Sequence, residues 1–170
     1  AKIICDENGK AIDIKKRERF DGEKMIEDFM VAANEIVAKH FINNDKPGIY
    51  RVHDVPRPEK IQTFINFCNA NGKKIKGKFT NINPHTFQKL LAQLKLEGSE
   101  EIIYKSLAIR SMPKAYYSYE NIGHFGLASR NYTHFTSPIR RYPDLFTHRL
   151  IHEFFFSNNN TENEFASVLP

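Results

Sequence analysis

Cysteine is scarce in this sequence, and its shortage excludes several classes of protein. Cys5 and Cys68 form no CxxC pair and are too few for a disulfide framework. A reducing, cytoplasmic compartment is therefore the simplest expectation. No apolar run approaches the roughly 20 residues needed to cross a bilayer, and no signal-peptide pattern is present. We therefore expect no membrane partner.

Clustered metal ligands are also missing from the sequence. The aspartates are scattered along the chain, and no DxDD string occurs. His148 and His152 have the i,i+4 spacing that could bind zinc from one helix face. Their sequence, HRLIHE, lacks the order of a metalloprotease motif and has no third ligand nearby. A structural histidine pair is the preferred interpretation, and we expect this chain to bind no metal on its own.

Basic and apolar residues are what the chain does have. Its 170 residues are 41% hydrophobic, which suffices for the core of one domain or of a large piece of one. The formal net charge of +5 suits a partner rich in phosphate, because Lys and Arg neutralise phosphates and release counterions. RNA or DNA is therefore a candidate partner, although charge alone does not prove it.

Periodicity predicts an α+β fold that is rich in helix and opens with a β-hairpin. The hairpin spans residues 2–20 around an Asn-Gly turn signal, and a short strand is expected in IYRVHDV. Residues 115–136 have no helical period and should be strand and loop. Five helices are expected. The first spans residues 22–41, the second begins at Pro58, the third ends at Gly98, the fourth begins at Ser99, and the last spans residues 137–156. The polar tail, residues 157–170, is expected to be mobile.

The helix at residues 22–41 shows two faces. Apolar residues recur at three- and four-residue spacing, which predicts a buried face made of Ile26, Phe29, Met30, Ala33, Val37 and Phe41. Glu27 and Asn34 lie along another face, where spacing alone favours a solvated surface.

Ser137 and Pro138 look like the start of the last helix, with Ser137 as N-cap and two arginines in the first turn. Arg140 and Arg141 are unfavourable beside the positive end of a helix dipole, unless an anion binds there. The alternative is that the arginines pair with carboxylates such as Asp144, and one of them is expected to do so. Pro143 lacks an N–H, so the helix could also restart near Tyr142.

The string HFGLASRNYTHFTSPIRRYPDLFTHRL closely resembles the signature of the RNB-domain exoribonucleases, the ribonuclease R and ribonuclease II family. Three further segments fit the family in the same order: DENGKAIDIKKRER, KMIEDFMVAANE and PGIYRVHDVPRPEK. The RRYPD and RVHDVP strings are closer to the ribonuclease R branch. The resemblance implies that residues 1–156 are the C-terminal portion of an RNB catalytic domain.

This resemblance implies a parent that hydrolyses RNA processively from its 3′ end to nucleoside monophosphates, using Mg²⁺. The metal-binding aspartates would lie before Ala1, and an S1 RNA-binding domain would lie beyond Pro170. The fragment itself is then expected to be inactive, with the 3′ end of single-stranded RNA and the rest of the parent chain as partners. The alternative is a non-catalytic basic RNA-binding or scaffold module with an RNB-like shape.

The resemblance also assigns roles to residues. Arg140 matches the family arginine near the scissile phosphate, where a guanidinium stabilises negative charge that grows in the transition state. Glu27 and Asn34 match positions on a helix that faces the RNA channel. Arg51 and His53 could contact RNA, or this segment could instead form a buried ion pair with Asp54 or Glu59. The remaining predicted RNA-binding residues are Ser137, Arg141 and the aromatic Tyr132.

Overall fold

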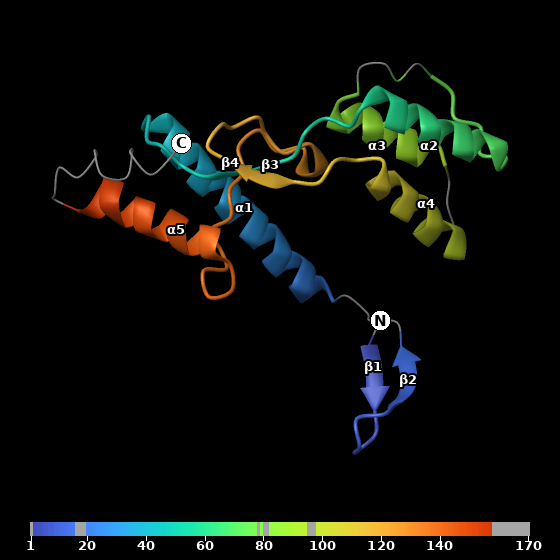
Figure 1. Cartoon of the computed structure of the whole chain (residues 1–170), viewed down its shortest axis with the longest axis horizontal. Helices are drawn as coiled ribbons and strands as arrows, with labels where there is room; N and C mark the ends of the chain where they lie inside the picture. The colour runs from blue at the N-terminus through green and yellow to red at the C-terminus, as the bar shows by residue number, and fades with distance from the viewer. Residues whose placement is uncertain (1, 16–19, 78, 80–81, 95–97, 158–170) are drawn as a thin grey trace. The chain divides into compact units, whose positions relative to one another are not determined.

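The computed structural model describes residues 2–15, 20–77, 79, 82–94 and 98–157, and the chain divides into two compact units (Figure 1). The first unit is Ala1–Ala33 and the second is Asn34–Pro170. The predicted α+β class is confirmed, with five α-helices and two small antiparallel strand pairs among the described residues. None of the helices in these ranges is long and apolar enough to cross a membrane.

The first unit begins with the predicted hairpin. Strands β1 (Lys2–Cys5) and β2 (Ala11–Lys15) pair antiparallel, with Ile4 opposite Asp13. One Asp6 side-chain oxygen accepts hydrogen bonds from the backbone N–H groups of Asn8 and Lys10, both at 2.9 Å. Gly9 has a φ of +79°, a conformation that glycine adopts without steric cost. The Asn-Gly signal therefore marked the turn correctly.

Helix α1 (Asp21–Asn43) runs through the boundary between the two units. The buried face predicted for it is wrong in part, because Ile26 and Phe29 are more than half exposed. In the second unit the buried residues of α1 are Asn34, Ala38 and Phe41. The buried stripe therefore follows Asn34 and Ala38 rather than their neighbours Ala33 and Val37, and it includes a polar residue.

The second unit contains a short two-stranded sheet. Strand β3 (Tyr50–Val52) pairs antiparallel with β4 (Tyr116–Ser118), and Arg51 lies opposite Tyr117. Tyr50 and Val52 pack with Ala38 of α1 in a small core. Arg51 projects from the other face of the strand, as strand alternation requires.

Three helices between these strands form what we call the helical module: α2 (Pro58–Ala70), α3 (Pro84–Ala92) and α4 (Gly98–Arg110) (Figure 1). Asn83 caps α3, because its side chain accepts a hydrogen bond from the Thr86 N–H. The largest core cluster lies here and includes Ile61, Phe64 and Leu90. Phe125, from the short 3₁₀ turn η1 (Phe125–Leu127), joins this core beside Phe87.

The last helix starts later than predicted. Helix α5 spans Tyr142–Ile151 and continues as a π-helical turn, η2 (His152–Phe156). The expectation that Ser137 caps a helix over residues 137–156 is wrong, because residues 138–140 form only a turn and Arg141 is extended (φ −127°, ψ 115°). Pro143 explains the break, since it offers no N–H to the carbonyl of Ile139 and its ring crowds that carbonyl, whereas a proline is tolerated in the first turn of a helix.

Candidate nucleic-acid interface

Residues 133–141, which we call the arginine loop, carry both candidate arginines into α5. The loop has almost no regular structure, yet side chains from several elements hold its backbone. Thr133 donates its hydroxyl hydrogen bond to the carbonyl of Ile49. Because such bonds fix its backbone, the loop can hold charged groups at defined positions although it is not a helix.

Asn34 is the anchor that α1 supplies. Its side-chain oxygen accepts hydrogen bonds from the backbone N–H groups of Phe135 (2.9 Å) and Thr136 (3.2 Å). Its amide nitrogen donates to the Tyr132 hydroxyl at 3.0 Å. Asn34 is only 3% exposed, so all this bonding occurs in a buried setting. The structure therefore gives Asn34 a positioning role, and a direct RNA contact by Asn34 stays a prediction.

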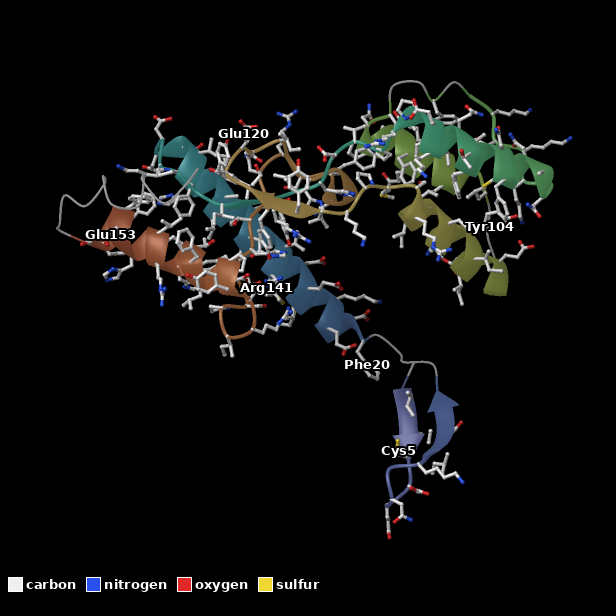
Figure 2. The ribbon with its side chains drawn as sticks, viewed as in Figure 1. Cys5, Phe20, Tyr104, Glu120, Arg141 and Glu153 are labelled. Carbon is white, nitrogen blue, oxygen red and sulfur yellow. The ribbon has the colours of Figure 1, made fainter. Side chains whose placement is uncertain are left out.

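Asp144 is the anchor that α5 supplies. One oxygen of this fully buried carboxylate accepts hydrogen bonds from the Ser137 N–H (2.8 Å) and from the Arg141 guanidinium (2.7 Å). The expectation that one arginine pairs with Asp144 is confirmed, and that arginine is Arg141. Figure 2 labels Arg141 near the start of α5. An internal carboxylate thus takes the place near the start of α5 where the sequence suggested an external phosphate.

Arg140 has the opposite surroundings. It is exposed, and its guanidinium makes a long hydrogen bond of 3.4 Å to the Ser137 hydroxyl. Within the described ranges no carboxylate forms an ion pair with it. The neighbouring Ile139 side chain is also fully exposed, so the tip of the arginine loop stands free of the surface of the unit. Arg140 is therefore available to an anionic ligand, whereas Arg141 is not.

His148, on α5, contacts the arginine loop at Phe135. Its Nε2–H donates to the Phe135 carbonyl at 2.9 Å, and its ring stacks on Phe135 with centroids 4.1 Å apart. The structural interpretation of His148 is confirmed. His152 is exposed, and no group of three or more His, Cys, Asp or Glu side chains among the described residues could hold a metal ion.

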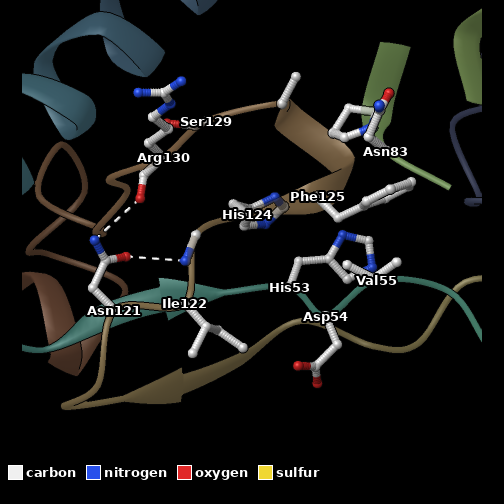
Figure 3. A pocket seen from close by; sticks show the side chains of 13 residues that line it. His53, Asp54, Val55, Asn83, Asn121, Ile122, His124, Phe125, Ser129 and Arg130 are labelled. Atoms are coloured by element: carbon white, nitrogen blue, oxygen red, sulfur yellow. Dashed lines mark hydrogen bonds between the residues drawn. The ribbon is translucent and has the colours of Figure 1, made fainter. Parts of the chain in front are cut away.

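His53 joins three chain segments. Its Nδ1 accepts a hydrogen bond from the Gly126 N–H and its Nε2–H donates to the Pro113 carbonyl, both at 2.8 Å. Figure 3 shows the Asp54 carboxylate turned away from the His53 ring. Neither of the proposed ion pairs, with Asp54 or with Glu59, is present in this described part of the chain. Both ring nitrogens are engaged with backbone, so this geometry fits a structural role, and the proposed RNA contact stays a prediction.

Tyr132 packs between two histidine rings. Its ring lies edge-on to His124 and His134, with centroids 5.3 and 5.9 Å away. Burial, and then the neighbouring His53, lower the pKa of His124 to about 4. Burial and then the Arg141 guanidinium hold the pKa of His134 at about 4. Both imidazoles are therefore neutral near pH 7, and base stacking by the buried Tyr132 stays a prediction.

A cavity of about 790 Å³ lies between the β3 end and the loop before Tyr132 (Figure 3). His53, His124 and Asn83 are among the residues that line it. Asn121 closes one side, because its side chain donates to the Arg130 carbonyl (3.1 Å) and accepts from the Gly123 N–H (3.1 Å). The polar groups of Asn121 therefore bind the backbone of the cavity wall rather than a ligand in the cavity.

The structure brings together most, but not all, of the predicted site residues. Asn34, Tyr132, Ser137, Arg140 and Arg141 meet at the arginine loop of the second unit. Glu27 is exposed on the first-unit part of α1. Tyr117 and His134 belong to the same cluster but are not among the predicted site residues, although their aromatic, strand-like segment was visible in the sequence.

Comparisons with known proteins agree with this arrangement. Residues 1–157 match the model of the RNB domain family. The chain is 48% identical to Ribonuclease R of Thermotoga maritima over 99% of its length and 24% of the relative's, and 48% identical to Ribonuclease R 1 of Lactococcus lactis over 90% and 19%. The structure of Mycoplasma genitalium RNase R in complex with ribose methylated single-stranded RNA matches 98% of the chain and 27% of its own, with 33% identity and a TM-score of 0.87.

The chain spans only about a quarter or less of the length of the curated relatives named above. The match to the family nevertheless covers residues 1–157 of its 170 residues. With that coverage, and with relatives that are 48% identical, the chain belongs to the RNB domain family.

Proposed function

We propose that this chain is part of the catalytic domain of a 3′→5′ exoribonuclease similar to ribonuclease R. The observation that carries the proposal is the arginine loop, where one arginine is fixed by a buried carboxylate and the next, Arg140, is left exposed. Relatives named ribonuclease R, and a structural neighbour in complex with single-stranded RNA, support RNA as the substrate. The full protein would hydrolyse RNA processively to nucleoside monophosphates.

Arg140 is the proposed catalytic residue of this chain. Negative charge grows on the phosphoryl oxygens during hydrolysis, and a planar guanidinium can bind two oxygens at once. Arg141 and Ser137 act through Asp144, which holds the loop so that Arg140 meets the phosphate. Asn34 contributes the same kind of support from α1 and is itself bonded to the Tyr132 hydroxyl, while Glu27 remains a candidate contact to RNA on the other unit.

The metal and the remaining partners are proposed for the rest of the protein. Mg²⁺ would supply an activated water and neutralise phosphate charge. The described residues do not fit such an ion, since they contain no cluster of three ligands. We propose that its aspartate ligands, and an S1 domain that holds the RNA strand, belong to the rest of the protein, and that the compartment is the cytoplasm.

A degradation assay separates this function from that of a non-catalytic RNA-binding module. The full-length protein is incubated with single-stranded RNA that is labelled throughout its length, with Mg²⁺ or with EDTA. We expect mononucleotides to appear only with Mg²⁺, and the 170-residue chain alone to release none. RNA that is bound but not shortened by the full-length protein would favour the non-catalytic module. Metal-dependent cleavage by the isolated chain would contradict the proposed placement of the metal ligands.

A further inference from the structure

Arg51 lies beside the arginine loop in a setting unlike that of either loop arginine. It sits opposite Tyr117 in the β3–β4 pair, and its guanidinium lies over the Tyr117 ring at 4.7 Å from the centroid. Its backbone N–H donates to the Tyr132 carbonyl at 2.9 Å. The side chain is half-buried and therefore held in place from two sides.

No carboxylate neutralises Arg51 among the residues that the structure describes. The nearest buried carboxylate, Asp144, already binds Arg141 and the Ser137 N–H through one oxygen. A cation–π contact attracts the guanidinium but leaves its charge uncompensated. A guanidinium that is held in place, partly open to solvent and without a counterion from the described residues is available to an anion from outside the chain.

The groups around Arg51 leave the cluster positive. Tyr117 Oη and His134 Nδ1 are hydrogen-bonded at 2.7 Å, and both groups feel the charges of Arg51, Arg141 and Asp144. His134 adds no charge near neutral pH, because burial and Arg141 hold its pKa at about 4. Two guanidinium groups and one carboxylate then give the cluster one excess positive charge.

We propose that Arg51, laid over Tyr117 beside Arg141, binds a phosphate group other than the one that Arg140 meets. A guanidinium suits this ligand because its N–H groups match two phosphate oxygens. The inference rests on the proposed function, which makes RNA the source of the phosphate. That phosphate belongs either to the bound strand or to the released mononucleotide, and the test distinguishes these sources.

Salt dependence of binding by the full-length protein provides the test. Single-stranded RNA is titrated in EDTA, so that it binds without being cut, over a range of salt concentrations. Each phosphate contact to a single strand contributes about 0.7 to the slope of log affinity against log salt. We expect Arg51→Gln to lower the slope by about 0.7. Arg57→Gln, which removes the same charge from an exposed residue whose side chain makes no capping bond, should leave the slope nearly unchanged.

Competition by a nucleoside 5′-monophosphate in the cleavage assay identifies the source. A lower slope with unchanged product inhibition assigns the phosphate to the strand. An unchanged slope with weaker product inhibition assigns it to the mononucleotide. If Arg51→Gln changes neither, the phosphate site is wrong, whereas the proposed function still stands if the wild-type protein degrades RNA.

Arg51→Lys provides a second variant in case Arg51→Gln does not fold. It keeps the charge but not the paired N–H geometry, so the salt slope should persist while affinity for the phosphate ligand falls several-fold. Wild-type affinity for both the strand and the mononucleotide in Arg51→Lys would overturn the proposed site.

Discussion

The helical module and the arginine loop are stabilised by different kinds of interaction. The module buries apolar side chains such as Ile61, Phe64 and Leu90 from three regular helices. The loop instead depends on hydrogen bonds in which Asn34 and Asp144 accept from its backbone N–H groups and His148 donates to a backbone carbonyl. Apolar packing tolerates small shifts, whereas hydrogen bonds fix positions to within tenths of an ångström. The loop is therefore the part suited to placing a charged group against a reacting phosphate.

Charge is distributed between these regions in an unexpected way. Residues 58–110 contain nine Lys and Arg against four Asp and Glu, which equals the whole net charge of +5. The rest of the chain, arginine loop included, is neutral overall. Net charge therefore indicates that the chain suits a polyanion, but it does not locate the candidate catalytic arginine.

Among the substitutions that test this difference between the helical module and the arginine loop, Asp144→Ala is expected to have the largest effect on stability. This change leaves Arg141, whose side chain is 21% exposed, and the Ser137 N–H without their acceptor. Breaking a buried ion pair costs about 3–5 kcal/mol. Urea unfolding of the full-length protein, with single-turnover cleavage under folding conditions, should show loss of both stability and rate.

Leu90→Ala is the matched control in the helical module. Leu90 is fully buried, and its truncation should cost about 2–5 kcal/mol. Leu90 takes no part in the hydrogen bonds that hold the arginine loop. The rate of RNA cleavage under folding conditions should therefore stay close to that of the wild type. Equal rate losses in the two variants would mean that the loop has no special positioning role.

A smaller effect on stability is expected at Gly126, where the turn η1 meets His53. A Cβ on Gly126 would lie 2.7 Å from His53 Nδ1, so Gly126→Ala should destabilise the protein by about 1–3 kcal/mol. In a His53→Ala background the obstructing ring is gone, and the same glycine substitution should cost less than half as much. A double-mutant cycle by urea unfolding measures this coupling. Additive losses would show that His53 does not set the position of this turn.

Acid should weaken the ring cluster beside the loop by a still smaller amount. His134 has a pKa of about 4 in the folded protein, below the ordinary value of about 6.5. The unfolded chain thus binds more protons between these values, and stability is full above pH 6.5 and lost as pH falls towards 4. His134→Gln should flatten this dependence by on the order of 1 kcal/mol after solvent screening. Parallel pH curves for wild type and variant, measured by urea unfolding, would contradict the assignment.

The sequence was sufficient to predict the elements whose signals are local. The hairpin, α2, α3 and α4 follow from a turn signal, from prolines at helix starts and from apolar spacing. The start of α5 was placed too early, because the Ser137-Pro138 pattern outweighed the effect of Pro143. The exposed Ile26 and Phe29 show the same limit, since spacing predicts an apolar face but not what covers it.

The candidate site was predictable as a motif but not as a geometry. The resemblance identified Arg140 as the candidate catalytic residue, and the sequence predicted that one arginine pairs with Asp144, but only the structure shows that it is Arg141. Asn34 binds residues about a hundred positions away, and Tyr117 reaches His134 across seventeen. No local pattern carries such contacts, so the anchors of the arginine loop became visible only in the structure.

The central claim is that the loop fixes Arg141 through Asp144 so that Arg140 stabilises the transition state. Single-turnover cleavage at saturating full-length enzyme, with a parallel binding titration in EDTA, tests it most directly. We predict that Arg140→Ala lowers the rate about 10²–10³-fold, or roughly 3–4 kcal/mol, while affinity falls only a few-fold. Arg140→Lys should restore little, because an ammonium cannot bind two oxygens as the guanidinium does. A near wild-type rate for saturated Arg140→Ala enzyme would contradict the account.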